Sequence, residues 1–190
     1  MKLSRRFEKA LVYATRIHGG QLRKKTRIPY IAHILGVTAI AMEYGANETE
    51  TIAALLHDAV EDAGGEKRLR DIEKKFGKVV AKIVDGCTDT YETPKPPWME
   101  RKKRYIEHIL QDSNSSTRLV SASDKLHNTR AILAELRRVG LEVFDRFAGK
   151  KDGTLWYYRT LVTAFRHHGD HKDLIDELDR VVTEIEKLSR

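Results

Sequence analysis

Apolar positions recur along almost the whole chain with the spacing of amphipathic helices. Near the N-terminus, Phe7, Ala10 and Ala14 follow Ser4, a residue type favoured at helix N-caps. Near the C-terminus, the apolar residues of the segment 174–188 form a single stripe at helical spacing. The alternation of apolar and polar residues that is typical of strands is nearly absent, so the pattern predicts an all-α fold.

Glycine, proline and capping residues divide this pattern into separate helices. Pro29 precedes the second helix, Asn47 is placed to cap the third, and the Gly64-Gly65 pair is expected to end it. A proline-rich stretch at about residues 87–97 predicts a long loop. After the first helix, which begins beyond Ser4, the predicted helices cover residues 30–44, 48–62, 69–76, 78–84, 98–111, 116–139, 154–167 and 174–188. The two shortest segments are each expected to end at a glycine.

Length and composition place the chain among ordinary soluble domains. The 190 residues suit a single domain, residues 1–190, and 41% hydrophobic with 33% charged residues excludes a disordered or membrane-embedded chain. The apolar runs are too short to span a bilayer, and the basic N-terminus lacks the apolar segment of a signal peptide. The single cysteine, Cys87, excludes an intrachain disulfide framework. We therefore expect a cytoplasmic protein.

The charge balance favours anionic partners without choosing among them. Lysine and arginine number 35 against 28 aspartate and glutamate residues, which gives a formal net charge of +7. Much of the positive charge lies in two short runs, residues 23–25 and 101–104. Such runs are most often solvated helix faces or loops, so charge alone leaves nucleic acid, nucleotides and phosphorylated metabolites open.

The segment LLHDAVEDA, residues 55–63, concentrates polar groups beside an apolar stripe. If the segment is one helix, His57 and Glu61 lie four residues apart on one face, as do Asp58 and Asp62. Buried or half-buried charge is costly without a partner, and a bound cation would remove that cost. A histidine next to an aspartate is common by chance, so this segment alone does not separate a metal site from a charged helix face.

Two further segments supply matching groups. His33 lies upstream in PYIAH, and Asp124 lies downstream in SASDKLHN. Together with His57 and Asp58, they offer two imidazoles and two carboxylates from three predicted helices. This mixed set of nitrogen and oxygen donors suits a divalent transition metal such as Mn, Fe, Co or Zn, with open positions for water and a phosphate oxygen.

These residues and their flanking segments resemble a known family. The order His, His-Asp and Asp on a helical chain is similar to that of the HD phosphohydrolase superfamily. Five segments resemble the hydrolase domain of the RelA/SpoT homologues: HGGQLRK (18–24), PYIAH (29–33), AALLHDAVED (53–62), FGKVVAKIVDGCTD (76–89) and SDKLHNTR (123–130). The resemblance implies an HD-domain helical bundle and a small, single-domain hydrolase. Such a hydrolase removes the 3′-pyrophosphate from guanosine tetra- and pentaphosphate and leaves GDP or GTP.

The resemblance also implies roles for individual residues. One group would bind a single divalent metal, typically Mn²⁺ in this family: His33, His57, Asp58 and Asp124. A second group would orient or deprotonate the attacking water, or hold the substrate: Glu61, Asp62 and Asn128. A third group would contact the nucleotide: Arg23, Lys24 or Lys25, Asn128 and Tyr158. An arginine can stack on a purine or fork onto a phosphate, while a lysine supplies a point charge.

Two alternatives remain open from the sequence. The same metal centre would also serve another nucleotide, such as an adenine alarmone, NADPH or a nucleoside monophosphate. A different class is a non-catalytic, basic helical binding protein, which gives no reason for the four metal candidates to meet and predicts that the two basic runs form one patch. We expect a guanine nucleotide partner, with no membrane and no stable nucleic-acid partner, and we leave oligomerisation open.

Overall fold

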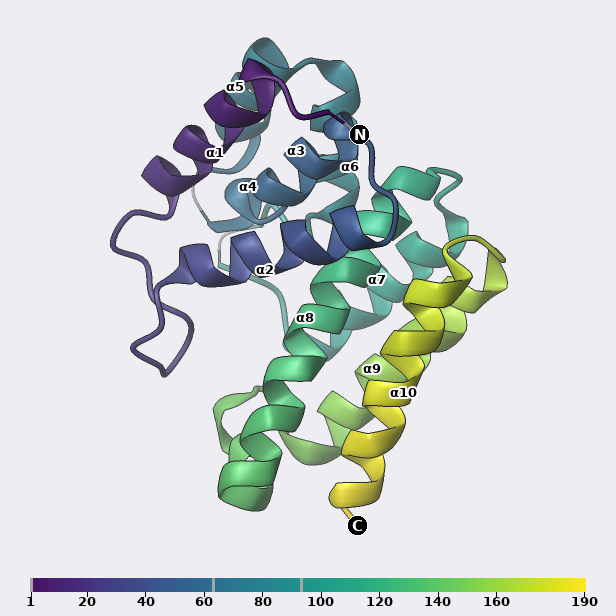
Figure 1. Ribbon diagram of the computed structural model, residues 1–190. Helices are drawn as coiled ribbons and strands as arrows, with labels where there is room; N and C mark the ends of the chain where they lie inside the picture. Colours follow the sequence, from purple (N-terminus) through teal and green to yellow (C-terminus); the bar gives the residue numbers. More distant parts are fainter. Residues whose placement is uncertain (1, 63, 93) are drawn as a thin grey trace.

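The computed structural model describes residues 2–62, 64–92 and 94–190, with every side chain in these ranges except that of Asp62. Within these ranges the chain is helical almost throughout, and its single β feature is an isolated bridge between Leu22 and Pro29 (Figure 1). The prediction of an all-α fold is therefore confirmed. In chain order the elements are α1 (Arg5–Ile17), α2 (Tyr30–Glu43), α3 (Glu48–Leu56), α4 (Ala59–Asp62), α5 (Gly65–Phe76), α6 (Lys78–Cys87), α7 (Trp98–Gln111), α8 (Ser115–Val139), the 3-10 helix η1 (Gly140–Arg146), α9 (Lys150–His167) and α10 (Lys172–Leu188).

Helix α8 runs through the middle of the molecule (Figure 1). It has 25 residues and packs against α2, α3, α6, α9, α10 and η1. Helix α2 crosses it on one side, and α10 lies along it on another (Figure 1). Residues from distant parts of the chain therefore meet along α8.

Helix α3 lies at the centre of the apolar core of the N-terminal half. Every residue from 51 to 56 is buried, because α1, α2, α6 and α8 pack around this helix. Its N-terminus is capped at the predicted residue, since Asn47 and Glu50 form a reciprocal capping box. The C-terminal end of α3, where His57 follows, is therefore held in a fixed position.

The predicted continuous helix over residues 48–62 is wrong, because it is interrupted at His57 and Asp58. Helix α3 ends before this pair and α4 begins after it. The Nδ1 atom of His57 lies 2.8 Å from the carbonyl oxygen of Ala54. The ring N–H thus donates to a carbonyl group that would otherwise accept a backbone N–H of the next helical turn. The helix is therefore interrupted at His57 and Asp58, two of the candidate metal ligands.

Two further boundaries differ from the predicted ones. Helix α5 begins at Gly65 rather than at residue 69, and Gly64 is its N-cap, so the glycine pair lies at the start of this helix. Helix α6 does not end at Gly86 but continues through it to Cys87. A Cβ atom at Gly86 would lie 2.6 Å from the Cγ2 atom of Thr117 on α8. This glycine therefore serves close helix packing rather than helix termination.

Helix α9 begins at Lys150, before the predicted residue 154, and runs through Gly153. A Cβ atom at Gly149 would lie 2.6 Å from the Trp98 ring, and one at Gly153 would lie 3.2 Å from it. The two glycines, one turn apart, therefore form a slot that receives the Trp98 indole of α7. The sequence pattern also missed η1, which follows α8 directly.

The other predicted helices are confirmed with small shifts at their ends. Ser4 caps α1 by accepting a hydrogen bond from the backbone N–H of Arg6, and α7 has the predicted bounds. The loop before α7 also lies where the prolines place it. No helix in the described part of the chain is long and apolar enough to cross a membrane.

Candidate functional site

The four residues predicted to bind a metal lie together, and we call them the metal cluster: His33, His57, Asp58 and Asp124. The histidine of α2 places its Nε2 atom 3.4 Å from Asp58 Oδ2 and 3.3 Å from Asp124 Oδ1. His57 Nε2 lies 3.1 Å and 3.7 Å from the same two oxygens. Three elements thus converge: α2, the turn between α3 and α4, and α8.

The donor atoms of the cluster fit a metal ion. One ligand atom from each of His33, His57 and Asp58 lies within 4.8 Å of the other two, and Asp124 approaches both imidazoles. The two histidines are only 2% and 3% exposed. The buried Nε2 atom of His57 makes no hydrogen bond with any described residue. A buried imidazole nitrogen without a hydrogen bond is costly, and a divalent cation among these carboxylates would remove that cost.

The protonation of the His57 ring follows from its backbone contact. Because Nδ1 donates to the carbonyl of Ala54, the neutral ring keeps its proton on that nitrogen and turns the lone pair of Nε2 toward the carboxylates. This is the tautomer that a metal ligand requires. The same hydrogen bond therefore interrupts the helix and prepares the ligand.

The electrostatics of the cluster keep both carboxylates ionised. Burial raises the pKa of Asp58, but the adjacent His57 outweighs it, so the pKa lies well below its ordinary value. Burial likewise opposes ionisation of Asp124, but Lys125 and the two cluster histidines hold its pKa well below its ordinary value. Two ionised carboxylates in a buried place create a strong preference for a bound cation.

His33 has an imidazole, rather than a carboxylate, as its outer partner. The Nδ1 atoms of His33 and His127 are 2.9 Å apart, and Nη1 of Arg23 lies 3.3 Å from His127 Nδ1. Burial, with His33 and Arg23 nearby, lowers the pKa of His127 to about 4, so its ring is neutral. The contacts agree when His33 Nδ1–H and Arg23 both donate to His127 Nδ1, which leaves His33 Nε2 free for a metal.

Gly36 allows this histidine pair to form across two helices. A Cβ atom at Gly36 on α2 would lie 2.3 Å from the His127 ring of α8. The absence of a side chain at this position thus lets the ring reach His33.

Two further side chains fix the carboxylates of the cluster. The Tyr30 hydroxyl donates a 2.6 Å hydrogen bond to Asp58 Oδ2, and Lys125 Nζ lies 2.6 Å from Asp124 Oδ2. Both contacts orient a carboxylate from outside the cluster, as the outer partners of metal ligands do. Neither residue, nor His127, was predicted to belong to the site, although all three lie inside the motifs PYIAH and SDKLHNTR. Their position within three residues of a predicted ligand was the one feature of the sequence that could have indicated their role.

Asn128 links the metal cluster to the predicted nucleotide contacts. Its Nδ2 donates a 2.6 Å hydrogen bond to Asp124 Oδ1, and its Oδ1 accepts a 2.7 Å hydrogen bond from Arg23 Nη2. Arg23 lies in the loop before α2, and its side chain reaches α8. An antiparallel bridge between Leu22 and Pro29 closes this loop into a short hairpin. The structure therefore brings these two candidates into direct contact.

The acidic pair of α4 lies next to the cluster in sequence. Glu61 Oε1 accepts a 2.6 Å hydrogen bond from Nζ of Lys95, which lies in the proline-rich loop. The side chain of the other candidate, Asp62, lies outside the described part of the chain. Lys95 was not predicted to contact the site.

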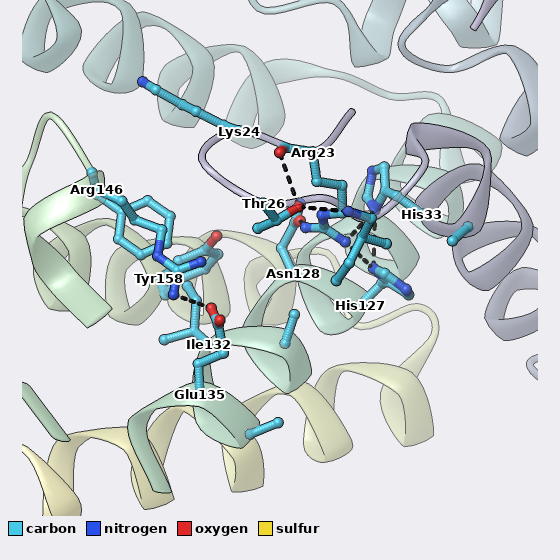
Figure 2. A pocket seen from close by; sticks show the side chains of 15 residues that line it. Arg23, Lys24, Thr26, His33, His127, Asn128, Ile132, Glu135, Arg146 and Tyr158 are labelled. Carbon is cyan, nitrogen blue, oxygen red and sulfur yellow. Dashed lines mark hydrogen bonds and ion pairs between the residues drawn. The ribbon is translucent and has the colours of Figure 1, made fainter. Parts of the chain in front are cut away.

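Two neighbouring cavities open beside the cluster, and we call the larger one, of 390 Å³, the first cavity. Figure 2 shows its lining, with Arg23, His33 and His127 at one end and Arg146 and Tyr158 at the other. Its wall between these ends is largely apolar, with alanines and Ile132 from α8 and Phe147 after η1. Such a mixture of an apolar wall and a few polar groups suits a planar base with attached phosphates.

The second cavity, of 310 Å³, adjoins the first and has a more cationic lining. Four residues line both cavities: Lys24, Asn128, Phe147 and Tyr158. Of the residues predicted to contact the nucleotide, Lys24 and Tyr158 thus line both cavities. Lys25, the alternative to Lys24, is exposed with a positive φ of 57° and lies outside both linings.

Comparison with known proteins agrees with this arrangement. The HD domain family matches residues 10–154. The guanosine-3′,5′-bis(diphosphate) 3′-pyrophosphohydrolase MESH1 of Danio rerio is 39% identical over 121 residues, which cover 62% of this chain and 64% of that protein. A GTP pyrophosphokinase of Streptomyces coelicolor is 35% identical over 130 residues, which cover 67% of this chain but only 15% of that protein.

Solved structures resemble the chain over more of its length. A metazoan ortholog of SpoT, described as hydrolysing ppGpp, superimposes with a TM-score of 0.76 and 28% identity over 95% of this chain and 96% of that one. A protein of Listeria monocytogenes gives a TM-score of 0.69 and 30% identity over 82% of this chain and 99% of that one. The similarity to the SpoT ortholog extends beyond the matched domain into the C-terminal helices.

Proposed function

The chain belongs to the HD domain family, and on that premise we propose that it is a metal-dependent hydrolase that removes the 3′-pyrophosphate from guanosine tetra- and pentaphosphate. The predicted fold class, an HD-domain helical bundle, is confirmed by the family match and the structural neighbours. The observation that carries the proposal is the cluster of two imidazoles and two carboxylates beside two cavities that are lined by cationic and apolar side chains. The named activities of MESH1 and the SpoT ortholog support the choice of substrate.

The metal in this proposal is Mn²⁺, held by His33, His57, Asp58 and Asp124. Two imidazole ligands disfavour the harder Mg²⁺ and suit a transition metal. When bound, such an ion supplies Lewis-acid stabilisation of the charge that develops on the transferred phosphoryl group.

The remaining candidates act around this centre. Glu61, together with Asp62, orients the attacking water and takes its proton. Arg23 and Asn128 form a hydrogen-bonded pair that positions the nucleotide next to Asp124. Tyr158 offers a ring for base stacking at the far end of the first cavity, and Lys24 offers a charge for a phosphate.

The products of the reaction test this proposal. Guanosine tetraphosphate, treated with the Mn²⁺-loaded protein in ¹⁸O-labelled water, is expected to give GDP and intact pyrophosphate. In an in-line displacement the water attacks from the side opposite the leaving group. Its ¹⁸O atom therefore enters one of the two products. Stepwise release of two orthophosphates, or cleavage of the 5′ chain, would identify a general phosphatase instead.

Two alternative functions, hydrolysis of another nucleotide and non-catalytic binding, can be separated from the proposed one. A panel of adenine alarmones, NADPH and nucleoside monophosphates separates the proposed activity from hydrolysis of another nucleotide by the same centre. The non-catalytic binding protein gives no reason for the Nε2 atoms of the two cluster histidines to lie 3.1–3.7 Å from the carboxylate oxygens. We also propose that residues 1–190 act as one domain, because α10 packs along α8, the helix that carries Asp124.

A further inference from the structure

His18 belongs to the motif HGGQLRK but has no part in the site described above. It follows α1 as the C-cap residue, and its backbone N–H donates a 3.0 Å hydrogen bond to the carbonyl oxygen of Ala14. Any residue except proline can make this bond, because it involves the backbone alone. The side chain is nevertheless an imidazole that is only 2% exposed. Ending the helix therefore does not account for the buried ring.

The ring is held by the tight turn that His18 begins. The N–H of Gln21 donates a 3.0 Å hydrogen bond to the carbonyl oxygen of His18, and Gly20 has a φ of 82°, which glycine adopts without strain. Across this turn, Nδ1 of His18 lies 2.7 Å from Oε1 of Gln21. An amide oxygen only accepts hydrogen bonds, so the neutral ring carries its proton on Nδ1. The turn therefore fixes both the position and the tautomer of the ring.

Tyr30 packs against this ring and connects it to the metal cluster. The centres of the His18 and Tyr30 rings are 5.1 Å apart, and Tyr30 also contacts the cluster residue His33, with ring centres 5.4 Å apart. The backbone N–H of Tyr30 donates a 2.8 Å hydrogen bond to the carbonyl oxygen of Gln21. Its hydroxyl donates to Oδ2 of Asp58. Contacts from the turn thus reach a cluster carboxylate through one side chain.

Packing alone does not account for a histidine at this position. The Nε2 atom of His18 is buried and makes no hydrogen bond within the described part of the chain. A buried nitrogen without a partner costs stability, and a phenylalanine would fill nearly the same space without that cost. What a histidine adds is the hydrogen bond from Nδ1 to Gln21, which holds the ring in a single orientation.

From these contacts we propose that His18 is a positioning residue of the metal cluster, which holds the Tyr30 ring so that its hydroxyl stays on Asp58. Resting on the metal centre of the proposed function, this role adds a residue behind Tyr30 and no further ligand. A carboxylate whose orientation is fixed before the metal arrives binds it more tightly. Because His18 acts only through Tyr30, its removal cannot weaken metal binding more than removal of the Tyr30 hydroxyl does. A turn that only ends α1 would instead leave metal affinity unchanged.

Titration of the metal-free protein with Mn²⁺, in competition with a metal-binding dye, tests this role. His18→Phe keeps a ring of similar size but loses the Nδ1–H group, and Mn²⁺ binding should weaken about 3- to 10-fold, the contribution of one hydrogen bond. Gln21→Met removes the acceptor of the same bond and should give a similar loss, so the test remains decisive if the first variant does not fold. The matched control is His168→Phe, which removes a 2.8 Å ring contact with the carbonyl oxygen of Ile109 in another part of the chain. Its Mn²⁺ affinity should equal that of the wild-type protein.

A double-mutant cycle with Tyr30→Phe separates positioning from a structural role. Once the Tyr30 hydroxyl is absent, His18→Phe should change Mn²⁺ affinity by less than about twofold, because no contact with Asp58 remains to be held. Losses that add in the double variant would overturn the proposal. So would wild-type Mn²⁺ affinity in both His18→Phe and Gln21→Met, with only the free energy of unfolding lowered. A wild-type protein that binds Mn²⁺ but does not cleave guanosine tetraphosphate would refute the proposed function and leave this test intact, whereas one that binds no Mn²⁺ would refute both.

Discussion

The metal cluster and the second cavity lie on either side of Asn128 and are built in opposite ways. In the cluster, the half-buried carboxylate of Asp58 and the buried one of Asp124 are held in place by imidazoles and by outer contacts from Tyr30 and Lys125. In the second cavity, cations exceed their carboxylate partners, and two buried hydroxyls have no partner among the described residues. The first arrangement is suited to a cation, and the second to an anion.

This difference explains how one small fold can serve both chemistry and recognition. Ligands of a metal are preorganised when contacts from outside fix their orientation, as the Ala54 carbonyl, Tyr30 and Lys125 do in the cluster. Recognition of a phosphate can leave donors unpaired until the ligand arrives, at a cost to the stability of the empty protein. Substitutions in the metal cluster should therefore impair metal binding, whereas substitutions in the second cavity should impair binding of an anion.

The largest expected effect is loss of the metal. Asp58→Ala removes a cluster carboxylate and should abolish turnover and lower metal affinity more than about 100-fold, the upper range for losing an outer partner alone. Metal content after purification without chelator measures this, with Asp145→Ala as a control at an exposed aspartate. Full metal occupancy in Asp58→Ala would remove this residue from the ligand set.

The next effect separates chemistry from metal binding. Glu61→Gln keeps the size of the side chain but removes its basicity, so kcat should fall about 10²–10⁴-fold while the metal is retained. Steady-state kinetics and metal analysis on the same preparation give both quantities. A variant that changes KM alone would show that Glu61 binds substrate and takes no part in proton transfer.

A smaller effect is expected from an outer contact of the cluster. Tyr30→Phe removes the hydrogen bond to Asp58 and should weaken metal binding about 10- to 100-fold without loss of the fold. Tyr13→Phe is the matched control, because Tyr13 also donates to an aspartate, Asp71, but far from the cluster in the chain. Competition with a metal-binding dye compares the two, and equal affinities would contradict an outer role for Tyr30.

The glycine slot beneath the second cavity predicts a change in stability. Gly149→Ala would place a Cβ atom 2.6 Å from the Trp98 ring, and overpacking of this kind costs about 1–3 kcal/mol of the free energy of unfolding. Gly153→Ala meets the same ring at 3.2 Å and should cost less. Denaturant unfolding of both variants measures the order. The reverse order would mean that helix propensity, rather than the packing of Trp98, dominates here.

The smallest expected effect is the release of one proton when the metal binds. Burial lowers the pKa of His57, but Asp58 and Asp124 outweigh it and raise the pKa well above its ordinary value in the metal-free protein. In the metal-free protein His57 therefore holds a second proton, on Nε2, up to a higher pH than an ordinary histidine does, and metal binding at Nε2 must release it. Metal affinity should rise by up to about tenfold per pH unit below that pKa. Calorimetry in two buffers of different ionisation enthalpy detects the release, and identical heats would contradict it.

The sequence was sufficient to predict most helices and to name the four cluster residues that the structure brings together. Helices follow from the spacing of apolar residues and from caps such as Ser4 and Asn47, which act on their near neighbours. The ligand candidates lie in short segments, each carrying one or two of the required groups in an apolar setting. Their neighbours Tyr30 and His127 went unassigned, because a side chain can contact a ligand only after two helices have packed.

Tertiary structure decided the rest, since packing depends on residues far apart in the chain. A glycine can end a helix or admit a neighbour, and only the ring of Trp98 shows that Gly149 and Gly153 do the second. Likewise, a basic run can face solvent or line a cavity, and the packing of α7 against α9 buries Lys102. Local propensity determined the helices of this protein, whereas long-range burial determined which of its charges can meet a ligand.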